Sequence, residues 1–410
     1  MMAQGRISDE GVITAATGQG RRRPPRAAFL PFALPHITQA EIDEVVDTLR
    51  SGWIAAGPKV KRFEREFAEV IGAQHATALS SATAALHLAL EAVGAGPGDE
   101  VIVPVYTFTS SAAVVAHCGA RIVFADVDPA TCNLDAAKLE ALITPRTRAI
   151  VVVHIAGLPA EMDPILAIAR AHNLPIVEDA AHAFPARYRG RMIGTIGDLT
   201  AFSFYATKTL AVGDGGLLAT DNAEYAQRVA LMAMHGMSRD AWKRYTSEGS
   251  WYYEVVAAGF KYNMTDIAAA LGLQQLARRE WLLERRQAIA ARYTEAFAPY
   301  VELETPPNPA HVQHAWHLYM LRLRPERLTI GRDEFIKRLS AANIGTSVHF
   351  IPLLLQPYYR DAYGLTPSDF PAALDAYQRE ISLPIYPSMS EDDVEDVIAA
   401  VTAIVEAHRR

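Results

Sequence analysis

The sequence predicts an α/β protein, with a large unit built on a mostly parallel, mixed sheet between helices and a smaller α+β unit at the C-terminus. Three observations support this prediction. Between residues 100 and 220, short β-branched runs alternate with helical segments, which is the pattern of βαβ units. The runs are almost continuously apolar, as expected for strands buried on both faces of a sheet. After about residue 300 the parallel rhythm ends, and strands and helices mix without it.

Five apolar runs define the predicted strands of the large unit. They span residues 101–105, 121–125, 149–153, 175–178 and 200–204. Ligands of open α/β sheets bind beyond the carboxyl ends of the strands, so the residues just after each run are where a site is expected. Those residues are 106–108, 126–128, His154, 179–182 and 205–208.

Chain length and the change in sequence pattern predict where the two units divide. A chain of 410 residues exceeds the size at which a single core usually stops growing. We expect residues 29–280 to form the large, cofactor-binding unit and residues 281–410 the small one, linked by a helical pattern from about Thr265 to Tyr293. The charges from Arg278 to Arg286 are interpreted as a solvated helix face with i,i+4 pairs. Residues 1–28 offer little to bury and are interpreted as a flexible tail or an expression remnant.

Composition excludes several classes of protein. Half of the residues are hydrophobic and 21% are charged, with a formal net charge of −7, so nothing favours binding to nucleic acid. No apolar run reaches the length of a membrane-spanning helix, and the N-terminal region lacks the apolar core of a signal peptide. The two cysteines, Cys118 and Cys132, cannot form a disulfide framework and show no metal-ligand spacing. We therefore expect a cytoplasmic protein that binds neither nucleic acid nor membrane.

The segment 80–90 is a candidate phosphate site. Hydroxyl residues open a strongly helical Ala/Leu run, and Gly94 ends it. The free N–H groups and the positive dipole end of such a helix suit a phosphate. An ordinary N-cap that binds nothing explains the same residues when this segment is taken alone.

Asp179 ends the fourth predicted strand. A carboxylate at the end of a buried strand needs a partner that offsets its desolvation. The protonated ring nitrogen of pyridoxal phosphate is such a partner, and pyridoxal enzymes use this pairing to let the cofactor accept electrons. A helix cap or an arginine pair explains Asp179 equally well when the residue is taken alone.

Lys208 follows the fifth predicted strand. A single lysine is expected on the surface. This one shares the expected ligand edge of the sheet with Asp179, and Gly215 and Gly216 nearby permit a close approach of backbone to a flat ligand. A lysine amine becomes a Schiff-base nucleophile when desolvation or neighbouring cations lower its pKa. The combination makes Lys208 a candidate anchor for pyridoxal phosphate.

The order of these features resembles the DegT-type (DegT/DnrJ/EryC1/StrS) sugar aminotransferases over nearly the whole chain after the tail. The resemblance implies the aspartate-aminotransferase fold, which is fold type I of the pyridoxal phosphate enzymes. The motifs that carry the resemblance are 51–54, 57–58, 80–83, 96–101, 143–147, 178–183, 202–208, 259–263 and 314–318.

The family resemblance assigns roles at matching positions. Lys208 would hold the cofactor as a Schiff base and would shuttle the proton between its C4′ carbon and the sugar carbon. Asp179 would pair with the pyridine nitrogen. Ser203 and the backbone of Ala82 and Thr83 would bind the phosphate.

Four more residues take roles from the resemblance. Asn263 would reach the same phosphate from a second subunit, which implies a homodimer with shared active sites. Phe108 would stack on the cofactor ring, and His182 would contact the ring hydroxyl or face. His349 matches a position near the sugar site.

Within the family, this chain most resembles the UDP-4-amino-4-deoxy-L-arabinose aminotransferases, which share its Ser81-Ala82-Thr83 turn and its 259–263 motif. Phe108 departs from their tryptophan, and the spacer 205–207 also differs. The resemblance implies amination of a nucleotide-linked 4-keto sugar with glutamate as donor and 2-oxoglutarate as its product. A 3-keto sugar or a cyclitol ketone remains an alternative, as does a regulatory protein that has kept the fold without turnover. Dehydratase relatives replace the lysine with histidine, so Lys208 argues against their chemistry.

The remaining histidines are given structural interpretations. His87, inside the Ala/Leu helix, is interpreted as a packed core or interface residue. His311, His314 and His317 have no cysteine or acidic partner at metal spacing, so we expect no metal site.

Overall fold

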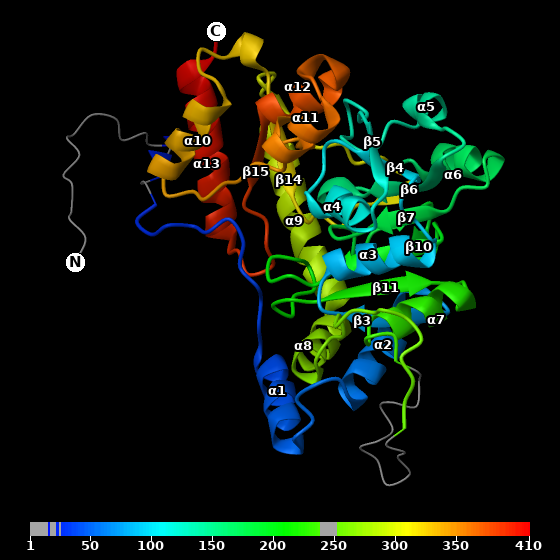
Figure 1. Cartoon of the computed structure of the whole chain (residues 1–410). Helices are drawn as coiled ribbons and strands as arrows, with labels where there is room; N and C mark the ends of the chain where they lie inside the picture. The colour runs from blue at the N-terminus through cyan, green and yellow to red at the C-terminus, as the bar shows by residue number, and fades with distance from the viewer. Residues whose placement is uncertain (1–14, 17–21, 24–25, 238–251) are drawn as a thin grey trace, which may run out of the picture.

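The computed structural model describes residues 15–16, 22–23, 26–237 and 252–410. Figure 1 shows a large sheet covered by helices, beside a smaller sheet. The smaller sheet shares an apolar cluster with the helices α9 (Arg279–Phe297), α10 (Arg332–Ala341) and α13 (Glu391–His408). No helix within these ranges is long and apolar enough to cross a membrane. The fold class expected from the sequence is confirmed.

The large sheet is mixed but mostly parallel. Its strands follow the order β3-β11-β10-β7-β6-β4-β5, and β11 alone among these strands runs opposite to the others. The strands are β3 (His75–Leu79), β4 (Glu100–Pro104), β5 (Arg121–Ala125), β6 (Thr147–Val153), β7 (Ile176–Asp179), β10 (Leu199–Ser203) and β11 (Gly216–Thr220). Each of the five predicted strands is present, and β3 and β11 are additional.

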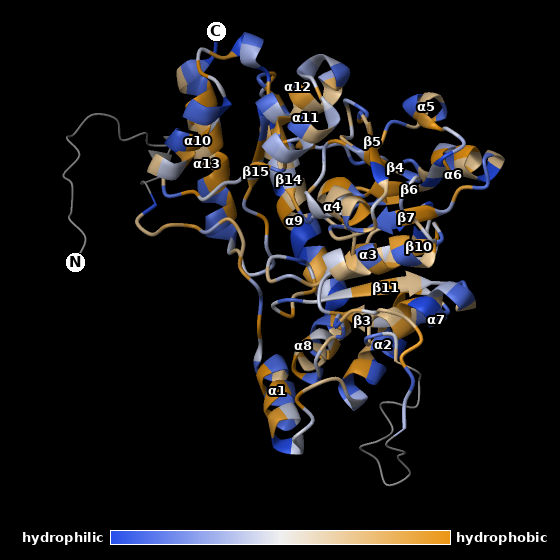
Figure 2. Cartoon of the chain, in the orientation of Figure 1, coloured by the Kyte–Doolittle hydropathy of each residue, from blue (hydrophilic) through white to orange (hydrophobic). Residues whose placement is uncertain are grey.

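Both faces of the large sheet are buried because alternate residues of each strand point to opposite sides. In β4, Val101 and Val103 pack in one apolar cluster with α3 and α4, whereas Ile102 packs in a second cluster with α2, α6 and α8. Figure 2 shows much of α3 and of the central strands in the orange shades of hydrophobic residues. The covering helices are α2 (Pro58–Ile71), α3 (Ala82–Ala92), α4 (Ser110–His117), α5 (Ala136–Leu139), α6 (Met162–Ala171), α7 (Ala223–Met232) and α8 (Asp266–Ala277).

The predicted linking helix is two helices. α8 ends at Ala277, and α9 (Arg279–Phe297) begins after Arg278. α1 (Gln39–Ser51) packs against α8 and extends away from the rest of the chain in Figure 1. Arg278 pairs with the buried carboxylate of Glu41 in α1, so this junction is held by an ion pair as well as by packing.

The small unit is built on a three-stranded antiparallel sheet of β12 (Leu303–Glu304), β14 (Tyr319–Leu323) and β15 (Glu380–Leu383). α9, α10 (Arg332–Ala341) and α13 (Glu391–His408) share its apolar cluster. α11 (Pro357–Tyr363) and α12 (Pro371–Arg379) instead contribute Tyr359 and Ala373 to the cluster of the large sheet. The proposed boundary near residue 280 stays a prediction.

Much of the predicted tail lies outside the described residues. Within it, β1 (Ala15–Ala16) and β2 (Arg22–Arg23) pair with each other. Arg26 forms ion pairs with Asp393 and Asp396 at 2.6 and 3.0 Å, which attaches the end of the segment to α13. A further small sheet joins β8 (Arg187–Tyr188), β9 (Arg191–Met192) and β13 (Val312–Gln313).

Candidate active site

Lys208 lies in the turn after β10, at the carboxyl edge of the large sheet. Its Nζ atom is 3.4 Å from Nε2 of His317, in the segment that leads into β14. The pKa of Lys208 is lowered to about 8, chiefly because burial disfavours the charged ammonium; the Arg286 cation acts in the same direction, and the Asp179 carboxylate opposes it. Some neutral amine therefore exists near pH 7, as a nucleophilic lysine requires.

Asp179 is the last residue of β7 and is 5% exposed. Its Oδ2 accepts a hydrogen bond from Ser111 Oγ at 2.7 Å, and its Oδ1 accepts one from the backbone N–H of Ala181 at 3.1 Å. Burial raises the pKa of Asp179, while these hydrogen bonds and the charge of Lys208 oppose the shift. Within the described ranges no ion pair reaches this carboxylate, so the site presents a desolvated anion that a cationic ligand atom would stabilise.

Two buried imidazoles lie beside Lys208. The rings of His182 and His317 are 4.4 Å apart, and Nδ1 of His182 accepts the backbone N–H of Ala156 at 3.2 Å. Burial and the charge of Lys208 hold the pKa of both histidines well below the usual range. Both rings are therefore neutral near pH 7, and they add no positive charge next to the lysine.

The interpretation of the segment 278–286 as a solvated helix face is wrong for Arg286, which is buried. Arg286 is 2% exposed, and its Nη1 donates to the backbone carbonyls of Trp316, His317 and Ile385 at 3.2, 3.2 and 2.7 Å. Burial lowers its pKa to about 10. The arginine fixes the turn that carries His317 and places a cation close enough to lower the pKa of Lys208.

A row of residues crosses the sheet next to the start of α3. Ser203 pairs with Gly216, Gly216 pairs with Leu79, and Leu79 forms a bridge with Asn263. A Cβ atom on Gly216 would lie 2.3–2.5 Å from backbone atoms of Ser81 and Ala82. Glycine is therefore required where β11 touches the turn before α3.

The start of α3 is arranged as an anion site. Ser81 caps the helix, because its side chain accepts the N–H of Ala84 at 3.0 Å. The N–H groups of Ala82 and Thr83 belong to the first turn, where a helix has no backbone acceptor of its own. They lie beside Gly216, which pairs with Ser203, so the structure brings the predicted phosphate residues of one chain together.

Asn263 lies beside α3 of its own chain. Its Nδ2 donates to the backbone carbonyl of Met264 at 3.1 Å. Its predicted contact with the phosphate of a second subunit stays a prediction.

Phe108 and His349 are the remaining predicted residues, and both are linked to other side chains of this region. Phe108 is 55% exposed, and its ring lies 5.9 Å from that of Phe350, which in turn stacks at 5.7 Å on His182. Nδ1 of His349 lies 2.8 Å from Ser382 Oγ. Burial, together with Lys208, lowers the pKa of His349 to about 4. The exposed face of Phe108 leaves an aromatic surface open to a ligand.

Two residues after strand ends, Asp126 and His154, form structural hydrogen bonds. Asp126 accepts the backbone N–H groups of Ala372 and Ala373 at the start of α12, at 3.1 and 3.0 Å. His154 forms a fully buried pair with Glu178, with 2.8 Å between Nε2 and Oε2. Neither residue belongs to the group around Lys208.

Sequence reasoning missed three contributors. Ser111 stands in the first turn of α4 after β4, and a hydroxyl beyond a strand end was the available signal. His317 lies in the family motif 314–318, but its side chain was weighed and rejected only as a metal ligand and received no role beside Lys208. Arg286 gave no signal, because nothing in its helical pattern distinguishes a buried arginine from an exposed one.

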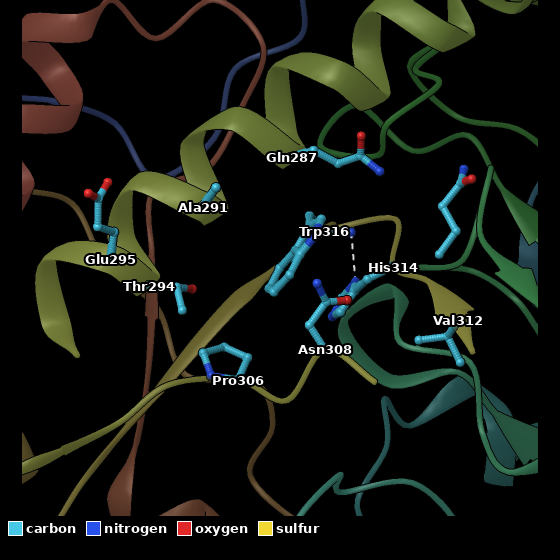
Figure 3. Close-up of a pocket in the computed structure, with 10 residues that line it drawn as sticks. Gln287, Ala291, Thr294, Glu295, Pro306, Asn308, Val312, His314 and Trp316 are labelled. Atoms are coloured by element: carbon cyan, nitrogen blue, oxygen red, sulfur yellow. Dashed lines mark hydrogen bonds between the residues drawn. The ribbon is translucent and has the colours of Figure 1, made fainter. Parts of the chain in front are cut away.

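An open pocket of about 650 Å³ lies behind the turn that carries His317. Figure 3 shows it between α9 and the segment 306–316, with the stacked rings of His314 and Trp316 at its wall. None of the predicted site residues lines it. The candidate site at the sheet edge and this pocket are therefore lined by different residues.

The chain belongs to the DegT/DnrJ/EryC1/StrS aminotransferase family, whose sequence pattern matches residues 35–402. It is 54% identical to the spore coat polysaccharide biosynthesis protein SpsC of Bacillus subtilis (strain 168), over 93% of this chain and 98% of that protein.

Solved structures agree with the family assignment. The putative sugar aminotransferase Spr1654 from Streptococcus pneumoniae in its PMP form is 36% identical, with a TM-score of 0.86, over 92% of this chain and 99% of that one. The aminotransferase TlmJ from Streptoalloteichus hindustanus is 35% identical, with a TM-score of 0.85 and the same coverage. Spr1654 is also known in a PLP form. The chain is thus a sugar aminotransferase that depends on pyridoxal phosphate.

The residues at the sheet edge fit this cofactor. A desolvated carboxylate, an amine of lowered pKa and a helix start with free N–H groups match its ring nitrogen, its aldehyde and its phosphate. His317 Nδ1 and Thr209 Oγ1 are buried without a hydrogen-bond partner in the described part of the chain. Buried polar atoms normally have partners, so these two are consistent with a site completed by a ligand.

We predict that Lys208 reacts as an amine with a pKa of about 8 in cofactor-free protein. Its rate of labelling by trinitrobenzenesulfonate should rise with pH and reach half of its plateau near about pH 8, because only the neutral amine is nucleophilic. Peptide mass spectrometry measures the rate, with the exposed Lys61 as the internal reference. A Lys208 profile that still rises steeply above about pH 10, the range of an unperturbed lysine, would contradict the burial effect.

Proposed function

We propose that this chain transfers an amino group from glutamate to a nucleotide-linked 4-keto sugar, as a homodimer with shared active sites. The observation that carries the proposal is the placement of Lys208, an amine of lowered pKa, and the desolvated Asp179 at one sheet edge. Similarity to a polysaccharide biosynthesis protein and to a putative sugar aminotransferase supports a sugar acceptor. The motif 259–263 and the Ser81-Ala82-Thr83 turn support amination at the 4-position.

Lys208 has two tasks in this proposal. Its Nζ would hold the cofactor aldehyde, and the same amine, when free, would carry the proton to and from the substrate carbon. Bound pyridoxal phosphate supplies the electron sink that stabilises negative charge on the substrate carbon. A pKa near 8 suits both directions of the proton transfer, because neither the acid nor the base form is too weakly populated near pH 7.

Asp179 holds a proton on the pyridine nitrogen. Ser111 and the N–H of Ala181 orient its carboxylate, and burial strengthens its attraction to a cationic ring nitrogen. His182 contacts the ring hydroxyl or the ring face as a neutral imidazole, and Phe108 stacks on the ring. The neutral state of His182 avoids a second cation beside the ring nitrogen.

Separate residues would bind the phosphate and the sugar. Ser203 and the N–H groups of Ala82 and Thr83 bind the phosphate, and Asn263 reaches it from the partner subunit. His349 binds the sugar. The hydrogen bond between its Nδ1 and Ser382 fixes the ring, so Nε2 is the nitrogen that remains for a sugar hydroxyl.

A panel of keto sugars tests the substrate. Purified enzyme with glutamate should convert 4-keto nucleotide sugars, with release of 2-oxoglutarate measured by a coupled assay. Conversion of 3-keto nucleotide sugars or cyclitol ketones alone would overturn the position of amination. Lys208→Ala is the control, and we expect its turnover to fall by at least about 10³-fold because the covalent anchor and the proton carrier are lost together. Absence of turnover with every ketone, although donor amine reaches the bound cofactor, would favour a regulatory role.

Mixed protomers test the shared site. We combine inactive Lys208→Ala and Asn263→Ala proteins in equal amounts, after confirming by mass spectrometry that mixed dimers form. With Asn263 acting across the dimer, each mixed dimer keeps one complete site, so about a quarter of wild-type activity should return. With Asn263 acting within its own chain, the mixture should show no more activity than the two proteins measured separately.

A further inference from the structure

Three side chains of different chemistry converge away from Lys208. His87 and Glu91 lie on α3, and Cys118 follows the last residue of α4. One ligand atom from each lies within 4.8 Å of the other two. The set combines an imidazole, a carboxylate and a thiol, which are the three ligand types that zinc takes in proteins.

The helix geometry explains how this convergence arises. His87 and Glu91 are four residues apart in α3, so their side chains lie on one face of the helix. α4 packs against α3 and brings Cys118 to that face. No metal-ligand spacing is visible in the sequence, because Cys118 follows a different helix from the one that carries His87 and Glu91.

The surroundings orient the cluster. His87 Nδ1 lies 3.2 Å from the hydroxyl of Tyr262, and the ring of Phe260 lies 4.7 Å away. The ring of His117 is 5.8 Å from that of His87. Arg228 is the charged neighbour, with its Nη2 atom 3.6 Å from Glu91 Oε2. A hydrogen-bonded histidine ring is typical of metal sites, because the partner fixes the orientation of the ligand.

The protonation states suit a cation. Burial lowers the pKa of His87, so its imidazole is neutral at pH 7. Burial and the charge of Glu91 raise the pKa of Cys118 to about 12. A divalent cation would reverse this second shift, because a coordinated thiol loses its proton to solvent.

We propose that His87, Glu91 and Cys118 bind one Zn²⁺ ion per chain, with water as the fourth ligand. Ligand atoms of tetrahedral zinc lie about 3.5 Å apart, given metal–ligand bonds of about 2.0–2.3 Å. The three groups must therefore approach by about 1 Å. Glu91 can supply this movement because its side chain is 26% exposed. The ion would tie α3 to α4, and the proposal does not depend on the substrate of the enzyme.

Cobalt is the probe for the test, since Co²⁺ replaces Zn²⁺ and a thiolate ligand gives it a near-ultraviolet charge-transfer band. Holoenzyme is first freed of metal with EDTA and then titrated with Co²⁺, with Mg²⁺ addition as the spectral blank. We expect the band to saturate at one Co²⁺ per chain, zinc to displace it, and zinc to raise the Tm. Absence of the band, or saturation without thiolate absorption, would overturn the proposal.

Variants locate the site. Cys118→Ser should abolish the thiolate band. Glu91→Gln should weaken cobalt binding by at least about tenfold, because even the loss of a residue that only supports a metal ligand typically has an effect of this size. Cys132→Ser is the matched control, because Cys132 is the other cysteine and lies outside the cluster. Circular dichroism establishes that each variant is folded, and Glu91→Gln keeps the test decisive if Cys118→Ser does not fold. A band that survives Cys118→Ser or an unchanged affinity in Glu91→Gln would contradict the assignment.

Discussion

The site depends on the burial of two opposite charges at one edge of a sheet. β7 and β10 are neighbouring parallel strands; Asp179 is the last residue of β7, and Lys208 lies in the turn after β10. Both side chains are desolvated, and they form no ion pair with each other. Burial makes the carboxylate strongly attractive to a cationic ring atom and makes the amine available as a base. Burial therefore perturbs both the carboxylate and the amine of the candidate site.

Strand register places the third part of the site. Because Ser203 pairs with Gly216 and Gly216 with Leu79, the end of β10 is held next to the start of α3. Only glycine at position 216 permits this approach, since a Cβ atom would overlap backbone atoms of Ser81. The antiparallel strand β11 is thus the element that joins the phosphate region to the lysine.

Sequence patterns predicted the parallel strands and the edge where Asp179 and Lys208 lie, because apolar runs and strand ends are local features. They missed β11, whose short Gly-Leu-Leu-Ala-Thr run has no alternation, and the buried state of Arg286, which depends on carbonyls far away in the chain. The convergence of His87 with Cys118 was also hidden, because it follows from the packing of α3 against α4. The roles at the phosphate, the cofactor ring and the sugar came from family resemblance and remain predictions; they concern Ala82, Thr83, Phe108, His182, Ser203, Asn263 and His349.

The pairing of Asp179 with the pyridine nitrogen is the central claim, and nitrogen NMR measures it directly. Apoenzyme is loaded with pyridoxal phosphate labelled with ¹⁵N in the ring, and the chemical shift is followed from about pH 6 to pH 9, a range in which an unperturbed carboxyl is ionised. We expect the ring nitrogen to stay protonated over this range in wild type and to lose its proton in Asp179→Asn. An unprotonated nitrogen in wild type, or a shift unchanged by the substitution, would contradict it.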